Sequence, residues 1–170
     1  PVFTLPDGST REFDAPTTGA ELAASIARSL ARDAVAIKVD GELLDLSRAI
    51  DADVNVEIVT RTTEDGLELL RHDAAHVMAE AVKELYPDCQ VTIGPSIEDG
   101  FYYDFARDEP FSSEELETIE KRMRDIVDRD EVIEREVWTR ADAVAFFKEQ
   151  GEFYKAEIIE SIPSEEDLTL

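Results

Sequence analysis

The chain has 170 residues, and 41 acidic side chains against 17 basic ones give it a formal net charge of −24. A protein that binds nucleic acid by itself presents a basic face to the phosphates, so this charge excludes a stand-alone nucleic-acid clamp. Hydrophobic residues make up 43% of the chain, which is enough for one or two cores and argues against disorder. We therefore expect two compact units, and any nucleic acid that they meet must be held mostly by another part of the protein.

Cysteine content and apolar runs bear on the compartment. Cys89 is the single cysteine, so no disulfide can form within the chain, which favours a reducing cytosol. The sequence opens on Pro1-Val2 without the basic-then-apolar order of a signal peptide. No apolar stretch approaches the ~20 residues that a membrane span needs. We expect a cytoplasmic protein without a membrane partner.

Residues 1–60 predict a small sheet wrapped over one helix. Thr18 and Glu21 have the spacing of a capping box, and the apolar face of the helix that follows is expected to carry Leu22, Ile26 and Leu30. Segments that favour strands lie at residues 2–5, 9–13, 35–39 and 54–59, with a short extended piece at 43–46. This ββαββ order is typical of a β-grasp domain, the first part of an α+β chain.

The polar segment 60–66 marks the expected boundary, with a second domain over 61–170. Elements predicted there are a helix over 67–86 ended by Pro87, strands over 91–93 and 101–105 joined by a loop at 94–100, a helix that starts at the Ser112–Glu115 capping box, a strand over 132–138 and a helix over 141–150. One face of the capped helix is expected to carry Leu116, Ile119, Met123, Ile126 and Val127. Leu168–Leu170 favours a strand that does not continue, so we expect the sequence to be a piece of a longer protein.

The two histidines of the chain lie in one short run. His72 and His76 are four residues apart, so on a helix they project from the same face, where they could share a metal, a water or a substrate. A helical wheel places an apolar stripe nearly opposite them, made of Leu67, Leu70, Ala74, Val77, Ala81 and Leu85. The residues beside the histidines, Ala75 and Ala79, are small and leave room for a ligand. The alternative is a pair of ordinary histidines that happen to lie close together.

A structural zinc is the second alternative for this pair. Zinc needs a third and usually a fourth ligand, and Cys89 has no partner thiol. Carboxylates such as Glu98 or Asp104 remain available as ligands. General acid–base chemistry or orientation of a substrate by neutral imidazole fits better, because histidine titrates near neutral pH. We therefore predict no metal site in this region.

Two further segments are candidates for a site. Gly94 and Pro95, followed by Tyr103, combine rigid and glycine-permissive backbone with an aromatic hydroxyl, which suits the wall of a small polar pocket. The alternative is a plain hairpin, with Phe101 and Phe105 in the core. Lys155 is a cation among aromatic and apolar residues, and its alternative is a surface lysine whose stem lies along apolar surface.

These segments occur together in an order that resembles the N-terminal part of bacterial threonyl-tRNA synthetases. The residues that carry the resemblance are Leu5-Pro6-Asp7-Gly8-Ser9, the β-grasp pattern to Val59, the run from Gly66 to His76, Ile93-Gly94-Pro95 and Gly100-Phe101-Tyr102-Tyr103-Asp104. The resemblance covers the whole chain. It implies a TGS domain of β-grasp fold at 1–60 and, at 61–170, the incomplete first part of an α+β editing domain. Such a domain, shared with alanyl-tRNA synthetases, hydrolyses seryl-tRNA made in error.

The resemblance also implies roles for particular residues. His72 and His76 match the paired histidines of the editing site, and Lys155 matches a lysine proposed to activate the hydrolytic water together with the first histidine. The positions that match the wall of the substrate pocket are Gly94, Pro95 and Tyr103. The family's pocket also takes a cysteine, a histidine and an aspartate from a segment after the strand that begins at Leu168. We therefore expect this region alone to have little or no activity.

For the whole enzyme, the resemblance implies ligation of threonine to tRNA(Thr) with ATP and Mg²⁺, a zinc in the catalytic core and a homodimer formed by other domains. This region would meet the 3′ end of tRNA(Thr) and would hold no cofactor. Two other classes of function stay open at this point. One is a ligand- or partner-binding regulatory module, and the other is a free-standing trans-editing deacylase.

Overall fold

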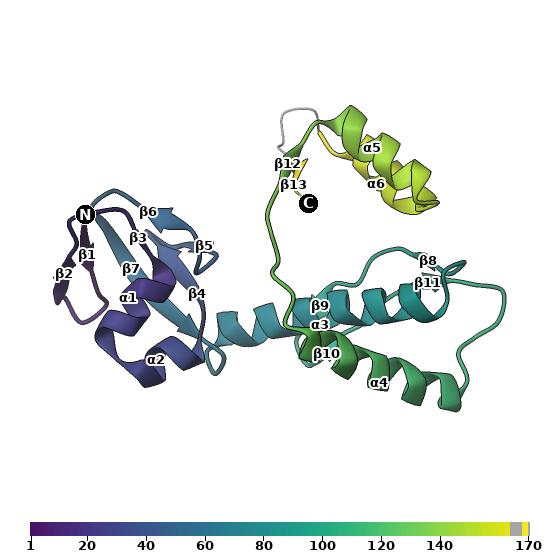
Figure 1. Cartoon of the computed structure of the whole chain (residues 1–170), viewed down its shortest axis with the longest axis horizontal. Coiled ribbons are helices and arrows are strands. Elements are labelled where there is room, and N and C mark those ends of the chain that lie inside the picture. The colour runs from purple at the N-terminus through teal and green to yellow at the C-terminus, as the bar shows by residue number, and fades with distance from the viewer. Residues whose placement is uncertain (164–167, 170) are drawn as a thin grey trace. The chain divides into compact units, whose positions relative to one another are not determined.

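The computed structural model describes residues 1–163 and 168–169. The chain divides into two compact units, Pro1–Leu70 and Arg71–Leu170, which are described separately (Figure 1). Both units combine helices and strands, so the chain has the expected α+β composition. Within the described residues, no helix is both long enough and apolar enough to cross a membrane.

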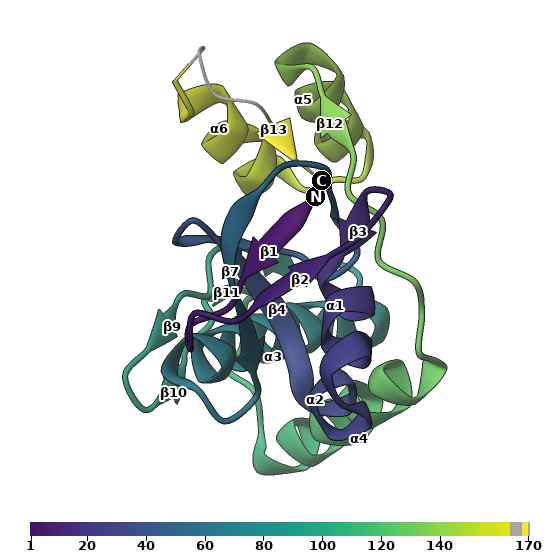
Figure 2. The ribbon, with the colours of Figure 1, turned by 90° about the vertical axis from the view of Figure 1, so that its left-hand side faces the viewer.

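A five-stranded sheet forms the first unit, with the strand order β2-β1-β7-β4-β5. Its strands are β1 (Val2–Thr4), β2 (Thr10–Glu12), β4 (Ala34–Val39), β5 (Glu42–Leu44) and β7 (Val54–Thr60). Figure 2 shows β1 beside β2 and β7, and it is antiparallel to β2 and parallel to β7. β4 is antiparallel to both β7 and β5. The predicted strands are confirmed.

Helix α1 (Gly19–Ile26) packs on one face of this sheet and begins at the predicted capping box. Thr18 Oγ1 accepts from the Glu21 backbone N at 3.2 Å, and the Glu21 carboxylate accepts from the Thr18 backbone N at 2.9 Å. The core between helix and sheet consists of Phe3, Leu22, Ile37, Ile50 and Val56. A tight turn follows β4, because Asp40 and Gly41 both have positive φ, as a two-residue hairpin turn requires.

Two details of the first unit differ from the prediction. The expected single helix through Leu30 is wrong: Ala27 is extended, with φ −161°, and separates α1 from the short α2 (Arg28–Asp33). The break redirects the chain so that β4 begins directly after Asp33. The short strands β3 (Thr17–Thr18) and β6 (Ala49–Ile50) also pair, which the sequence did not indicate.

The second unit begins within α3 (Glu64–Leu85), of which residues 71–85 belong to it; this helix ends before Pro87 as predicted and begins three residues earlier than expected. A long β-hairpin follows it, and then helices α4, α5 and α6. The hairpin consists of β8 (Gln90–Val91), β9 (Ser96–Ile97), β10 (Gly100–Phe101) and β11 (Phe105–Ala106). The remaining elements are α4 (Ser113–Arg129), β12 (Val137–Trp138), α5 (Arg140–Glu149), α6 (Phe153–Ser161) and β13 (Leu168–Thr169).

The hairpin is longer and its reversal tighter than expected. Val91 pairs with Phe105, while Ile97 pairs with Gly100, so the chain reverses at residues 98–99 rather than over the whole of 94–100. Between these pairs, Asp104 donates its backbone N–H to the Ile93 carbonyl at 3.1 Å. Part of the predicted loop, including Gly94 and Pro95, therefore lies between the two short ladders of the hairpin, β8–β11 and β9–β10.

Other expectations for the second unit need correction. The predicted strand over 132–138 shrinks to β12, and Val132 and Ile133 are 85% and 97% exposed. β12 pairs with β13, which leaves the earlier residues without a strand partner among the described residues. On α4 the capping box at Ser112 is confirmed, but Leu116 and Val127 are exposed. α4 meets the core along a narrower line than predicted, through Ile119, Met123 and Ile126.

Two separate apolar clusters stabilise the second unit. Residues of α3, the hairpin and α4 form one of them, centred on Ala81, Val82, Cys89, Ile119 and Ile126. The α5–α6 helix pair and β12–β13 form the other, centred on Ala143, Ile159 and Leu168. The candidate site draws its residues from both of these substructures.

Candidate active site

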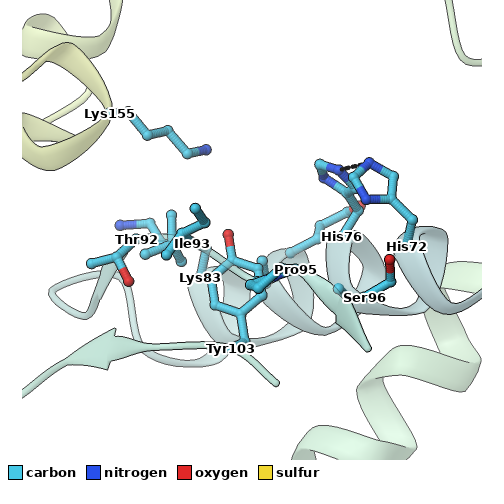
Figure 3. A pocket seen from close by; sticks show the side chains of 14 residues that line it. His72, His76, Lys83, Thr92, Ile93, Pro95, Ser96, Tyr103 and Lys155 are labelled. Atoms are coloured by element: carbon cyan, nitrogen blue, oxygen red, sulfur yellow. Dashed lines mark hydrogen bonds between the residues drawn. The ribbon is translucent and has the colours of Figure 1, made fainter. Parts of the chain in front are cut away.

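A pocket of about 840 Å³ lies in the second unit and is bordered by α3, the hairpin and α6. All six residues that the sequence singled out line it: His72, His76, Gly94, Pro95, Tyr103 and Lys155. Figure 3 shows the two imidazoles on α3 and the Lys155 side chain extending from α6 into the same space. The structure therefore brings together groups that are up to 83 positions apart in the sequence.

The two histidines form a direct pair. Their Nε2 atoms are 3.0 Å apart, and the rings meet edge to face with centroids 4.6 Å apart. At this distance one Nε2 carries the hydrogen and the other accepts it. Both histidines are only partly covered by the rest of the chain, so each remains accessible to a ligand in the pocket.

The small residues beside the histidines are buried and form part of the pocket wall. Ala75 is 1% exposed and Ala79 is 9% exposed. The predicted apolar stripe is partly wrong, because Leu67 and Leu70 are each 43% exposed. The buried face of α3 carries small alanines, which contribute little to a hydrophobic pattern, so the leucines alone indicated the wrong face. The histidines consequently lie next to the buried face of α3 rather than opposite it.

The surroundings of His76 favour its neutral form. Burial lowers the pKa of His76, and the positive charges of His72 and Lys155 lower it further, while Asp73 opposes them. A neutral imidazole has one nitrogen that accepts a hydrogen bond and one that donates, so it can hold a water or a polar substrate group. His76 is therefore suited to hydrogen bonding in the neutral form near physiological pH.

Gly94 and Tyr103 make a close contact that only glycine allows. A Cβ atom on residue 94 would lie 2.0 Å from Cδ2 of Tyr103, inside the van der Waals limit. The Tyr103 ring also stacks on Phe105, with centroids 4.8 Å apart, which limits its freedom to move away. Burial and the negative charge of Glu152 raise the pKa of Tyr103. Its hydroxyl therefore keeps its proton and is available as a donor.

Lys155 lies in the first turn of α6 and is half-buried. Its Nζ is 5.2 Å from the centroid of the Phe147 ring, an attractive cation–π arrangement that supports the stem against α5. Phe105, which the sequence suggested as core, packs against the α3–α4 cluster, as the hairpin alternative for that residue requires. The aromatic residues near the pocket thus divide into a core set and the pocket residue Tyr103.

Several residues of the site were not anticipated from the sequence. Glu80, Lys83, Thr92 and Ser96 also line the pocket. Lys83 lies two helical turns after His76, so its position on α3 was a usable signal. Glu152 lies 2.5 Å from Lys83, but no sequence pattern indicated it. It directly precedes α6, far from α3 in the sequence, and its burial depends on tertiary packing.

The described residues contain no group of three or more His, Cys, Asp or Glu side chains placed to hold a metal ion. Cys89 is buried in the α3–α4 cluster, where burial raises the pKa of its thiol. The groups singled out by the sequence that converge on the pocket are the two imidazoles, the Lys155 ammonium and the Tyr103 hydroxyl. Together they can hold a water and a polar substrate and can accept or deliver a proton.

Sequence comparison shows which known proteins the chain is similar to. Residues 1–60 match the family model of the TGS domain. The chain is 66% identical over 166 residues to a threonine–tRNA ligase of Parvibaculum lavamentivorans, covering 98% of this chain and 26% of that protein. Threonine–tRNA ligases of Granulibacter bethesdensis and Paramagnetospirillum magneticum are 59% and 61% identical over 170 residues, which is 100% and 99% of this chain.

The matched part of these relatives is short. The chain spans about a quarter of their length, 26% of the second and 27% of the third. Identity of 59–66% along nearly the whole chain shows that this region is homologous to theirs. The chain is homologous to the N-terminal region of threonine–tRNA ligases and carries a TGS domain at residues 1–60.

Proposed function

We propose that the pocket is a hydrolytic editing site that removes serine from mischarged tRNA(Thr), and that it serves a threonine–tRNA ligase. The observation that carries the proposal is the convergence of His72, His76 and Lys155 on one pocket, with Gly94 and Tyr103 in its wall. The proposed partner is the 3′ end of tRNA(Thr). The ATP, Mg²⁺ and zinc implied for the whole enzyme would be held by other regions of it.

The need for such a site follows from the size of the two amino acids. Serine is threonine without one methyl group, and a pocket gains only about 1–3 kcal/mol, or roughly 10- to 200-fold, from one such group. A synthetic site alone therefore charges serine too often. A second site can admit serine, exclude threonine by its additional methyl group, and hydrolyse the ester.

The residues of the pocket divide this work. We assign to His72 and Lys155 the placement and deprotonation of a water, with the lysine ammonium donating a hydrogen bond and the imidazole accepting the proton. His76, whose pKa is lowered, is neutral and orients the substrate. The backbone around Gly94, with the ring of Tyr103 packed on it, borders the space for the seryl group.

The proposed reaction is the hydrolysis of an ester. The water oxygen bonds to the carbonyl carbon of the seryl group while His72 takes a proton from the water. The bond between that carbon and the ribose oxygen then breaks, and the ribose oxygen receives the proton. The products are serine and tRNA with a free terminal hydroxyl, so no oxidant, reductant or other co-reactant is needed.

The family resemblance assigns further pocket residues to a segment outside this sequence. For this reason we expect the 170-residue chain by itself to hydrolyse seryl-tRNA slowly or not at all. A free-standing trans-editing deacylase would instead be fully active as this chain. A regulatory module would keep its function without the two histidines.

The experiment that tests the proposal uses the full-length ligase that carries this region. His72→Ala should lower the single-turnover rate of seryl-tRNA(Thr) hydrolysis by about 10²- to 10⁴-fold, the usual contribution of a general acid or base. Ligation of threonine to tRNA(Thr) should remain at the wild-type rate.

A matched control is Glu68→Ala, an exposed position one turn before His72 on the same helix that does not line the pocket. This variant should hydrolyse seryl-tRNA(Thr) like the wild type. Hydrolysis by His72→Ala at the wild-type rate would exclude the assigned role.

A further inference from the structure

The proposed chemistry depends on groups that belong to different substructures. His72 and His76 are on α3, whose apolar cluster includes Ala81 and Val82. Lys155 is on α6, which packs against α5 around Ala143. Because these two clusters are separate, the packing within each of them does not by itself place Lys155 over the histidines.

An ion pair between a half-buried lysine and a buried carboxylate joins the two substructures. Lys83 Nζ on α3 is 2.5 Å from Glu152 Oε1, and only 27% and 7% of these side chains are exposed. The same ammonium donates to the carbonyl oxygens of Pro87 at 2.7 Å and Cys89 at 3.1 Å. Two N–H donors of Lys83 are thus used by backbone carbonyls, and its charge lies against the Glu152 carboxylate, which holds its Nζ between α3, the chain leading to β8, and Glu152.

Glu152 lies at the start of α6, and its backbone is hydrogen-bonded to both α5 and α6. It is the residue that precedes the helix, yet its carboxylate does not cap the helix backbone. Its own backbone carbonyl accepts from the Ala156 N–H at 3.1 Å, and its N–H donates to the Phe147 carbonyl at 2.8 Å. The other carboxylate oxygen, Oε2, is buried without a hydrogen-bond partner among the described residues. The buried charge of Glu152 therefore relies on Lys83.

Lys155 follows Glu152 by three residues and lies in the first turn of α6. Any displacement of Glu152 is therefore passed directly to the backbone that carries the Lys155 side chain. A second ion pair of the α5–α6 helices, Lys148–Glu160, lies at 2.7 Å but is about half exposed at both ends, and it connects α5 only to α6. It has the same charges without a link to α3.

We propose that the Lys83–Glu152 ion pair is a positioning element that holds the first turn of α6 against α3, so that Lys155 faces the paired histidines. This inference rests on the proposed editing function and adds two residues to it. Neither of them needs to touch the substrate. A buried ion pair is often replaceable without loss of stability, so its value here is geometric rather than stabilising.

The test measures hydrolysis of seryl-tRNA(Thr) by the full-length ligase. Glu152→Gln keeps the shape of the side chain and removes its charge. It should lower kcat about 10- to 100-fold, because an ångström of misplacement in a catalytic group has effects of this size. The KM should change by less than about twofold, since positioning acts on the chemical step rather than on uniform binding.

A double-mutant cycle distinguishes positioning of Lys155 from a general loss of structure. Lys155→Met should lower kcat, and adding Glu152→Gln to it should lower kcat by less than about threefold more, because coupled residues are non-additive. The matched control is Glu160→Gln, which removes the same charge from α6 and should leave kcat at the wild-type value.

Folding is checked by thermal unfolding of each variant. If Glu152→Gln fails to fold, Lys83→Met combined with Glu152→Gln replaces it, because the double variant leaves no unpaired charge buried. Wild-type kcat in a folded variant, or a full multiplicative effect on top of Lys155→Met, would overturn the positioning role. Wild-type hydrolysis by Lys155→Met and His72→Ala would instead refute the editing function itself, whatever Glu152→Gln does, and the positioning role with it.

Discussion

His76 is surrounded by charges of both signs, and their balance decides its protonation. Burial has the largest effect and lowers its pKa, and the positive charges of His72 and Lys155 act in the same direction. Asp73, its neighbour along α3, acts in the opposite direction. Lys155 has the smallest of these effects, and it lies on α6 whereas His76 lies on α3. The pKa of His76 therefore depends in part on the position of α6.

This coupling gives a prediction at the level of single residues. Lys155→Met removes a positive charge near His76 and should raise the pKa of His76 toward its ordinary value. The measurement is a pH titration of the imidazole signals by NMR. The chain contains only two histidines, so His72→Ala assigns the spectrum completely.

Lys148→Met is the matched control for this titration. Lys148 is an exposed lysine of α5 paired with Glu160, and it is not among the charges that act on His76. It should leave the pKa of His76 unchanged. An unchanged or lower pKa in Lys155→Met would contradict the placement of the lysine beside the histidines.

The sequence could predict which residues form the site, but not which residues they contact. His72 and His76 were recognisable from their helical spacing, and the family resemblance pointed to Lys155. Glu152 was not recognisable, because one acidic residue among 41 carries no signal until the structure shows that it is buried. The contact between Gly94 and Tyr103 likewise depends on the hairpin register, which the sequence predicted only approximately.

At the scale of helices and strands, α3 and α4 are joined by more than their shared apolar cluster. Glu84 on α3 accepts hydrogen bonds from Arg122 at 2.8 Å and from Arg129 at 2.6 Å. These two guanidinium groups lower the pKa of Glu84 to about 2. The ordinary pKa of this carboxyl group is 4.5, so the folded state stabilises the ionised form of Glu84 relative to the unfolded chain.

The sign of the resulting pH dependence follows from the lowered pKa. The stabilisation by Glu84 should be fully present above about pH 5 and should be lost as the pH falls from about 4.5 toward 2, because the unfolded chain then binds the proton first. The measurement is the free energy of unfolding of wild type and Glu84→Gln at a series of pH values. The difference between them should shrink over this range.

Glu120→Gln is the control for this series, because Glu120 pairs with Arg124 within α4 and both side chains are largely exposed. Its effect on the free energy of unfolding should be small throughout. A wild-type advantage over Glu84→Gln that stays constant down to pH 2 would show that the two arginines do not act through the ionised carboxylate.

Elements set by local interactions were predictable, and elements set by distant partners were not. The capping boxes at Thr18 and Ser112 need only residues three positions apart, and both are confirmed. The strand over 132–138 was inferred from apolar residues alone, yet a strand also needs a neighbour, and only β12 has one in the described part of the chain. The break at Ala27 also depends on distant residues. The chain must turn into β4, although the helical pattern of the sequence continues through Leu30.

For the whole chain, the negative charge is concentrated in the part that contains the pocket. Residues 1–60 carry 11 acidic and 5 basic side chains, whereas residues 61–170 carry 30 and 12. A net charge of −18 over 61–170 repels RNA at long range. Under the proposed function, the 3′ end of the tRNA would therefore reach the pocket while other regions of the ligase hold the rest of the molecule.

This charge distribution also agrees with the size of the relatives. The chain matches about a quarter of each ligase, so most of the surface available to bind tRNA would lie elsewhere in such a protein. The charge of the sequence led to the expectation that other regions hold any nucleic acid, and this stays a prediction. Charge alone could not predict the pocket, because the pocket requires the placement of α6 beside α3 and the hairpin.

The central claim is that this pocket hydrolyses the seryl ester and spares the threonyl ester. The most direct test compares the single-turnover hydrolysis of seryl-tRNA(Thr) and threonyl-tRNA(Thr) by the full-length ligase under identical conditions. We predict that the seryl ester is hydrolysed roughly 10- to 200-fold faster than the threonyl ester, the discrimination that one methyl group allows. Equal rates for the two esters, or no hydrolysis of the seryl ester, would contradict the account.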